Sequence, residues 1–206
     1  MSDPIYEVIS KAKRQAESGN ADGAVKTLEV YLEKDQENVE VRLLLARTLI
    51  FDLKKVEEGT VQLYLALEYG PDNVDVMKAA VTVLMRNKKN NAKVTELFER
   101  LMTLDPDSEL YNMYAKFLRV QKTDFKTAGE YYEKAIALNP RKHEYHQNYA
   151  VLLLNDLKDY EKAKVELETL MELDPGNVSA KKNYDLLMKK KFDKNGNVIK
   201  KRRLFR

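Results

Sequence analysis

Residues 124–177 read DFKTAGEYYEKAIALNP, then RKHEYHQNYAVLLLND, then LKDYEKAKVELETLMELDPGN. Two near-copies of one unit lie end to end in this stretch. Each unit has an apolar helix with a small central residue, a turn, a second helix, and a stop that contains proline. Self-similarity at a fixed period is typical of repeat architectures, so we expect the same unit elsewhere in the chain.

The helix stops recur at a nearly constant step. KDQEN, YGPDN, LDPDS, LNPRK and LDPGN occupy residues 34–38, 69–73, 104–108, 138–142 and 173–177. Their central positions are 35, 35, 34 and 35 residues apart, at Gln36, Pro71, Pro106, Pro140 and Pro175. The spacing predicts five repeats.

Two short side chains recur within every unit. The first lies mid-way along the first helix, at Ala12, Ala46, Ala80, Ala115 and Ala150. The second lies early in the second helix, at Ala24, Gly59, Val94, Ala128 and Ala163. Small residues let two helix backbones approach closely, so we expect each unit to be a helical hairpin with these residues buried between its helices.

The pattern resembles the tetratricopeptide repeat, whose period is about 34 residues. The resemblance covers residues 5–177. It departs from the family in lacking a Trp near the start of the first helix, in one or two extra residues between the helices of most repeats, and in Gln36 at the first stop. It implies an all-α, right-handed superhelical solenoid whose concave inner surface binds extended or helical peptides.

The repeat boundaries predict one solenoid over residues 1–191. Its repeats span about 5–37, 38–72, 73–107, 108–141 and 142–176, and a capping helix spans 177–191. Such a helix is needed because the last repeat would otherwise expose its apolar face. Residues 192–206 form a basic tail, either a short hairpin at Asn195-Gly196 or disordered.

Composition limits the classes of protein. Charged residues make up 33% and apolar residues 44% of the 206 positions, which suits exposed helices around a continuous core. There is no cysteine, so disulfides and thiolate metal sites are excluded. No signal peptide or membrane-spanning apolar run is apparent, so we expect a cytoplasmic protein. Composition leaves the oligomeric state open.

No motif for catalysis, a cofactor or a metal ion is present. The two histidines, His143 and His146, lie three residues apart on a predicted helix, but no third zinc ligand is patterned near them. We therefore interpret both as surface residues. Nucleophile and phosphate-binding motifs are missing as well. The sequence predicts a protein that is not an enzyme and that needs no cofactor.

The inner surface should be lined by the residues three before and one, four and five after each central alanine. Repeats two and three then offer Leu43, Arg47, Ile50, Phe51, Met77, Val81, Leu84 and Met85. Repeats four and five offer Asn112, Lys116, Arg119, Val120, Gln147, Val151, Leu154 and Asn155. This predicts an apolar, Met-containing middle that suits an amphipathic helix, followed by two cations. The alternative is that these residues pack within the core.

Some members of the family clamp a C-terminal carboxylate of a chaperone with Lys, Asn and Arg side chains. In the first three repeats, the comparable positions are occupied by residues that include Ile9, Leu44 and Met77, so the resemblance implies no clamp there. Asn112, Lys116 and Asn148 give a partial likeness in repeats four and five. Lys116 and Arg119 could then hold an acidic motif.

The C-terminal charge predicts a second kind of partner. Residues 181–206 hold eleven Lys or Arg and two Asp, a net charge of +9, so residues 1–180 carry −6. Lys200, Lys201, Arg202, Arg203 and Arg206 could bind nucleic acid, a ribosome or an anionic surface. The leading hypothesis is a non-catalytic scaffold or adaptor that binds a protein or peptide in its groove. The alternative is a factor that binds nucleic acid through its tail.

Overall fold

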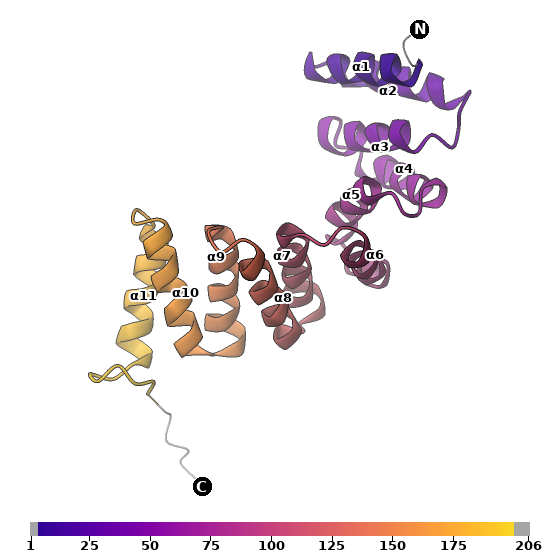
Figure 1. The fold of residues 1–206 in the computed structure, drawn as a ribbon. Coiled ribbons are helices and arrows are strands. Elements are labelled where there is room, and N and C mark those ends of the chain that lie inside the picture. Colours follow the sequence, from indigo (N-terminus) through magenta and orange to yellow (C-terminus); the bar gives the residue numbers. More distant parts are fainter. Residues whose placement is uncertain (1–3, 200–206) are drawn as a thin grey trace. The chain divides into compact units, whose positions relative to one another are not determined.

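Apolar residues at intervals of three and four make almost the whole chain helical. The computed structural model describes residues 4–199 and forms two compact units, of which unit 1 ends at Asp105 and unit 2 begins at Pro106. Unit 1 contains α1 (Pro4–Glu17), α2 (Ala21–Leu32), α3 (Val39–Arg47), α4 (Val56–Tyr69), α5 (Val74–Leu84) and α6 (Asn91–Leu104). Unit 2 contains α7 (Ser108–Phe117), α8 (Phe125–Leu138), α9 (His143–Leu152), α10 (Tyr160–Leu173) and α11 (Val178–Lys191) (Figure 1).

Consecutive helices pack as hairpins within each unit. The pairs α1–α2, α3–α4 and α5–α6 build unit 1, while α7–α8 and α9–α10 build unit 2, with α11 packed on α10. Between residues 4 and 199 there is no strand, only one isolated antiparallel bridge. The prediction of five helical hairpins followed by an eleventh helix is confirmed.

The small residues lie where the repeat pattern predicts. Ala46, Ala80, Ala115 and Ala150 are at most 2% exposed, and the short residues of the second helices are equally buried. Larger side chains fill the remaining space. In the first two hairpins of unit 1 this core consists of Ile9, Ala12, Ala24, Val25, Leu28, Leu32, Val41, Leu45 and Leu49. Close helix approach at the short residues therefore creates each hairpin.

Four helices end at the predicted proline stops, and two helices begin at aspartate caps. The residues before the four stop prolines, Gly70, Asp105, Asn139 and Asp174, all leave the helical region of backbone space, with ψ between 68° and 88°. A following proline disfavours the helical conformation, which explains where these helices end. Asp124 and Asp159 cap α8 and α10, since their carboxylates accept from Thr127 N and Lys162 N.

The extra residues between the helices are absorbed in two different ways. Repeat one has none, and its turn passes through Gly19 at φ 84°. Repeats two, four and five each have one, which becomes a π-helical turn: η1 (Thr48–Asp52), η3 (Leu118–Lys122) and η4 (Leu153–Leu157). A residue at positive φ follows soon after each of these turns. Repeat three has two and uses a 3₁₀ turn, η2 (Lys88–Asn90).

Replacing Thr123 with glycine is expected to stabilise unit 2. Thr123 has φ 55° and ψ 27°, the left-handed region, which is a strained conformation for a β-branched residue. Glycine removes this strain at some cost in unfolded-chain entropy, so we expect a net gain of about 0.5–1 kcal/mol in urea unfolding. Lys126→Gly, on the exposed side of α8, should instead lose about 1 kcal/mol. Equal losses for both variants would contradict this interpretation.

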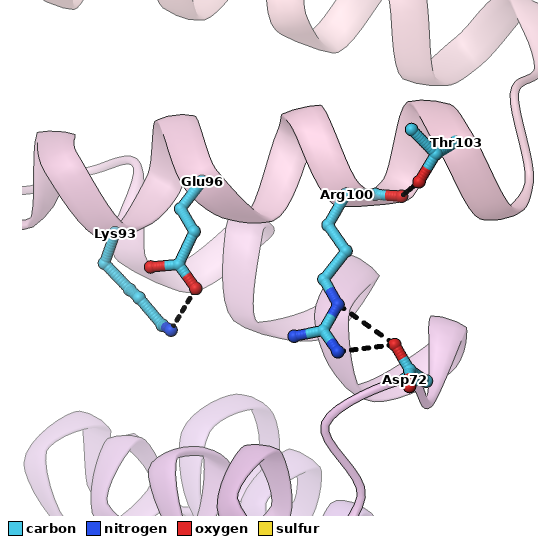
Figure 2. Close-up of polar contacts among 5 residues, drawn as sticks. All are labelled: Asp72, Lys93, Glu96, Arg100 and Thr103. Carbon is cyan, nitrogen blue, oxygen red and sulfur yellow. Dashed lines mark hydrogen bonds and ion pairs between the residues drawn. The ribbon is translucent and has the colours of Figure 1, made fainter.

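Exposed ion pairs lie on α6, and one of them reaches a neighbouring connection. Arg100 of α6 reaches the turn before α5, where its Nε and Nη2 lie 3.0 and 2.5 Å from Oδ1 of Asp72 (Figure 2). Lys93 and Glu96 pair within α6 at 2.8 Å (Figure 2). Such exposed pairs contribute about 0–1 kcal/mol each. They match the expectation that most charges of this chain lie on solvated helix faces.

A short hairpin follows α11. Phe192 pairs with Val198, and Asp193 N donates to Asn197 O at 2.8 Å. The loop therefore has three residues, with Gly196 at φ 80°, rather than the two that Asn195-Gly196 suggests. Phe192 is buried, and the Lys164 ammonium lies 5.9 Å from its ring centroid. The hairpin is thus docked on α10.

None of the helices in the described chain is long and apolar enough to span a bilayer.

Candidate partner-binding groove

The structure divides the predicted groove residues into two groups. Six are buried in the helical core: Leu43, Ile50, Met77, Val81, Leu84 and Asn112. Eleven keep some exposure: Arg47, Phe51, Met85, Lys116, Arg119, Val120, Gln147, Asn148, Val151, Leu154 and Asn155. The assignment of the six buried residues to an accessible surface was wrong. Ile50 shows the reason, because its Cγ1 fills the space beside Gly59 of α4 and so faces its own hairpin.

In unit 2, polar pairs close the seam between α7 and α9. Asn148 Nδ2 donates to Asn112 Oδ1 at 2.9 Å, and Lys116 Nζ lies 2.7 Å from Glu144 Oε1. Tyr145 OH donates to Glu109 Oε2 at 3.0 Å. These contacts involve residues 109–116 of α7 and residues 144–148 of α9. The two first helices of repeats four and five are thereby tied together.

The cations expected to hold a partner carboxylate are already paired. The hydrogen bond from Lys116 lowers the pKa of Glu144, so this carboxylate stays ionised beside it. Arg119 Nε lies 2.5 Å from Asp156 Oδ2, and both side chains are largely buried. Lys116 and Arg119, which were predicted to hold an acidic motif, therefore each already contact a carboxylate of this chain. Their carboxylate partners come from the next repeat, about 30 positions away, which the repeat pattern did not reveal.

The corresponding seam between α9 and α11 is open. No hydrogen bond or ion pair joins α9 or η4 to α11 in residues 4–199. A slot of about 60 Å³ lies between them instead. Its apolar surface comes from Ala150, Val151, Leu154, Leu167, Leu170 and Ala180, and its polar surface from Gln147, Asn177, Ser179 and Asn183. We call this slot, together with its continuation toward the end of α11, the amide groove.

Side-chain amides stand on both walls of the amide groove. Gln147 belongs to α9 and Asn183 to α11, and both are exposed. In the part of the chain that the structure describes, neither has a hydrogen-bond partner. By contrast, the side-chain amide of Asn148 donates a hydrogen bond to Asn112. Asn148 lies 35 residues before Asn183. The difference between the two seams is that one pair of amides is satisfied and the next is not.

The predicted residues of repeat five meet in this groove. Gln147, Val151 and Leu154 line the slot, and Leu154 and Asn155 line its continuation. The opposite wall was not predicted, because α11 was interpreted only as a cap. Asn183 could have been found by carrying the 35-residue register from Asn148 into α11. Within α11, Val178 is 79% exposed, whereas Leu187 is buried.

Unit 1 has a second opening, between α1 and the α3–η1 segment. This cavity of about 320 Å³ is lined by Lys13, Ala16, Glu17, Leu44, Arg47, Thr48, Phe51 and Asp52. Phe51 is 44% exposed and is presented by the π-helical turn η1. Arg47 and Phe51 therefore lie together at a surface. Charges of both signs line this opening, and it lacks the deep slot of the amide groove.

His146 is buried, and its interpretation as a surface residue was wrong. Its Nδ1 lies 2.6 Å from Glu166 Oε2 on α10, and its Nε2 lies 2.9 Å from Pro140 O. The hydrogen bond to Glu166 raises the pKa of His146, with burial opposing. His143 is exposed, as expected. No three His, Asp or Glu side chains are grouped as a metal site within residues 4–199.

Arg42 makes equivalent contacts three repeats earlier in the chain. Its Nε donates to Gln36 O at 2.6 Å, and its Nη1 donates to Gln62 Oε1 at 2.7 Å. Arg42 and His146 both lie four residues before the central alanine, and both reach the carbonyl of the stop residue. This repeated contact ties the first helices of repeats two and five, α3 and α9, to the connection before each and to the partner helix.

The tail residues Lys200, Lys201, Arg202, Arg203 and Arg206 lie outside the described residues.

Comparison with known proteins identifies the repeats. Residues 108–142 and 143–177 each match the family model of the tetratricopeptide repeat. These segments contain α7–α8 and α9–α10, so the resemblance seen in the sequence is confirmed there. A comparison with curated proteins finds no match.

Solved structures show the same fold over most of the chain. MamA from Desulfovibrio magneticus RS-1, from residue 41 to its end, is 18% identical with a TM-score of 0.75, covering 87% of this chain and 99% of that chain. MamA AMB-1 is 22% identical with a TM-score of 0.69, covering 88% and 98%. YrrB, a TPR protein with an unusual peptide-binding site, is 20% identical with a TM-score of 0.64, covering 79% and 82%. At these identities the likeness shows the fold.

Proposed function

We propose that this chain is a non-catalytic interaction scaffold and that the amide groove binds an extended peptide segment of a protein partner. One observation carries the proposal. The α7–α9 seam is closed by polar pairs, whereas the equivalent α9–α11 seam holds an empty slot with unpaired amides. Tetratricopeptide repeats in the same unit and the peptide-binding site named for YrrB support this class of function.

Extended peptide backbone suits the walls of the groove. Each side-chain amide offers two donors and an acceptor, which matches the alternating N–H and C=O groups of an extended chain. Gln147 and Asn183 face the slot from opposite sides. The apolar floor between them can take up a side chain of the bound segment. Amides would then supply affinity for any backbone, and the floor would select among side chains.

An α-helix fits this slot poorly. With its side chains, a helix is about 10–12 Å across. The slot holds only about 60 Å³, so it can admit one small side chain and not the apolar face of a helix. The lining residues also include no histidine and no carboxylate that could accept a proton from Ser179. This composition supports binding rather than catalysis.

Two valine-to-arginine variants test the proposal. Peptides selected by the wild-type protein from a random displayed library are synthesised with a fluorophore, and their affinity is measured by fluorescence polarisation. Val151→Arg places a charged side chain in the slot and should weaken binding by roughly tenfold or more, because the arginine occupies the apolar floor. Circular dichroism and thermal melting of the variant check that its helices remain intact.

Val165→Arg is the matched control. Val165 lies on α10 and is 57% exposed, away from the groove lining, so this variant should bind the peptides as the wild type does. Selected peptides that bind Val151→Arg as tightly as the wild type would overturn the proposal. Equal weakening by both variants would also overturn it, because the effect would then not depend on the groove.

A further inference from the structure

The amide groove continues into a wider cavity of about 270 Å³ at the ends of η4 and α11. The slot and this cavity share Leu154 and Asn183, so they are adjacent. Three lysines, Lys158, Lys190 and Lys191, line the cavity, and no carboxylate does. We call this part the lysine end. Its charge contrasts with the uncharged lining of the slot.

The three ammonium groups are held at the lysine end without a neutralising partner. Lys158 Nζ lies 3.4 Å from Leu154 O and also donates to Asn155 O, which are neutral carbonyls. Lys191 Nζ lies 4.8 Å from the Tyr160 ring centroid. Lys190 has no hydrogen bond or ion pair within residues 4–199.

Nearby carboxylates are engaged elsewhere. Asp156 pairs with Arg119, and Asp159 caps α10 through Lys162 N. The positive charge of the lysine end therefore has no counter-charge within its lining. Apolar neighbours such as Leu186 and Leu187 exclude part of the water around it. A carboxylate that enters this cavity would form charge-assisted contacts that are stronger than those at an open surface.

The volume of the slot limits the size of the side chain that a bound segment can place in it. An engineered cavity of about 150 Å³ takes up benzene, so one of about 60 Å³ suits a smaller group, of the size of an Ala, Pro or Val side chain. Ala150 lies at the slot and Lys158 at the lysine end, eight residues later. At about 1.5 Å per helical residue this is about 12 Å, which three to four extended residues span.

We infer that the segment bound in the amide groove carries a small apolar residue in the slot and, about three residues along, one or more carboxylates at the lysine end. This inference rests on the proposed function and names the chemistry of its partner. The chain's own tail is excluded as occupant by its charge, since residues 200–206 contain five Lys or Arg and no acid. Tyr160 is the one aromatic residue of the cavity lining and is covered by Lys191, so stacking of nucleotide bases has little support.

A matched set of two peptides and three proteins tests the inference. The first peptide is the tightest binder selected by the wild type, and the second has each Asp and Glu replaced by Asn and Gln. The proteins are the wild type, Lys190→Glu/Lys191→Glu, and the control Lys182→Glu/Lys189→Glu. The control reverses two charges on the same helix, beside Val178 and Asp185 and outside the groove.

The acidic peptide should bind Lys190→Glu/Lys191→Glu at least about tenfold more weakly than the wild type, and the control almost unchanged. The amide peptide should bind the wild type and Lys190→Glu/Lys191→Glu within about threefold of each other, because it has no charge to lose. This coupling between peptide charge and protein charge would be the positive result. A purely structural loss would weaken both peptides equally.

Several outcomes would overturn the inference while leaving the proposed function intact. The selected peptides could lose affinity for Val151→Arg yet contain no excess of Asp or Glu. Both lysine variants could weaken binding alike, which would indicate long-range charge. A fluorescein-labelled oligothymidylate that binds the wild type but not Lys190→Glu/Lys191→Glu would assign the lysine end to nucleic acid. If Val151→Arg has no effect on peptide binding, the proposed function itself fails.

Discussion

Replacing Gly59 with alanine should destabilise unit 1 by about 1–2 kcal/mol, while the same replacement at Gly129 should stabilise unit 2 by up to about 1 kcal/mol. Both glycines lie inside second helices, Gly59 in α4 and Gly129 in α8. Both are buried, so helix propensity alone predicts the same gain at each site. The surroundings of the added methyl group decide the sign.

The space at the two glycines differs by more than an ångström. A Cβ at Gly59 would lie 2.4 Å from Ile50 Cγ1 and 2.9 Å from the backbone oxygen of Ala46. The side chain can move but the carbonyl belongs to α3, so the helices must separate. A Cβ at Gly129 would lie 3.6 Å from Leu157 Cδ1 and 3.7 Å from Leu152 Cδ2, which are ordinary contacts. There the methyl group fills space and also removes the entropy cost of a helical glycine.

Hydrogen exchange measured by mass spectrometry assigns each effect to its unit. Stability in repeat proteins is approximately a sum of local and nearest-neighbour terms, so a single unfolding midpoint can mix the two units. Gly59→Ala should reduce protection in α3 and α4, and Gly129→Ala should increase it in α7 and α8. An increase of protection at α3 and α4 in Gly59→Ala would show that the close approach of these helices is wrong.

The sequence predicted the hairpins well because their causes are local and repeated. Short residues such as Ala115 and Ala128, stop prolines and Asp caps each act within one unit, and the 35-residue step supplies several independent examples. The extra residues were recognised as well, but not their form. A π-helical turn accommodates one extra residue at the end of a helix. The sequence of η3, LRVQK at residues 118–122, does not distinguish such a turn from an ordinary helix end.

The groove was harder to predict because accessibility depends on neighbours from other repeats. A first helix packs against two second helices, so a shift of one residue moves a side chain from groove to core. Ile50 and Met77 were predicted in the groove but are buried in the core, whereas Gln147 and Val151 are accessible. The repeat period also does not predict which side chains form ion pairs between repeats. Arg119 meets Asp156 only because both project from π-helical turns at the same level of adjacent repeats.

The contact between His146 and Glu166 should make the stability of unit 2 depend on pH. Both ring nitrogens face acceptors, the carboxylate of Glu166 and the carbonyl of Pro140. Only the imidazolium has two N–H donors, so the folded state favours the charged ring and the pKa of His146 is raised. A raised pKa gives stability that is complete below the unfolded pKa and is lost as the pH rises through the folded pKa. Unit 2 should therefore be more stable at pH 6 than at pH 9.

The expected loss of stability is about 1.5–3 kcal/mol, the range for hydrogen bonds to a charged group. Urea unfolding between pH 6 and pH 9, followed by hydrogen exchange in α9 and α10, should show this loss in the wild type. In His146→Gln the loss should largely vanish, because glutamine does not titrate. His143→Gln is the matched control, since His143 is exposed on the same helix and should leave the wild-type pH dependence unchanged. If His146→Gln keeps the full pH dependence, another group causes it, and the imidazolium between α10 and the α8–α9 connection is ruled out as the source.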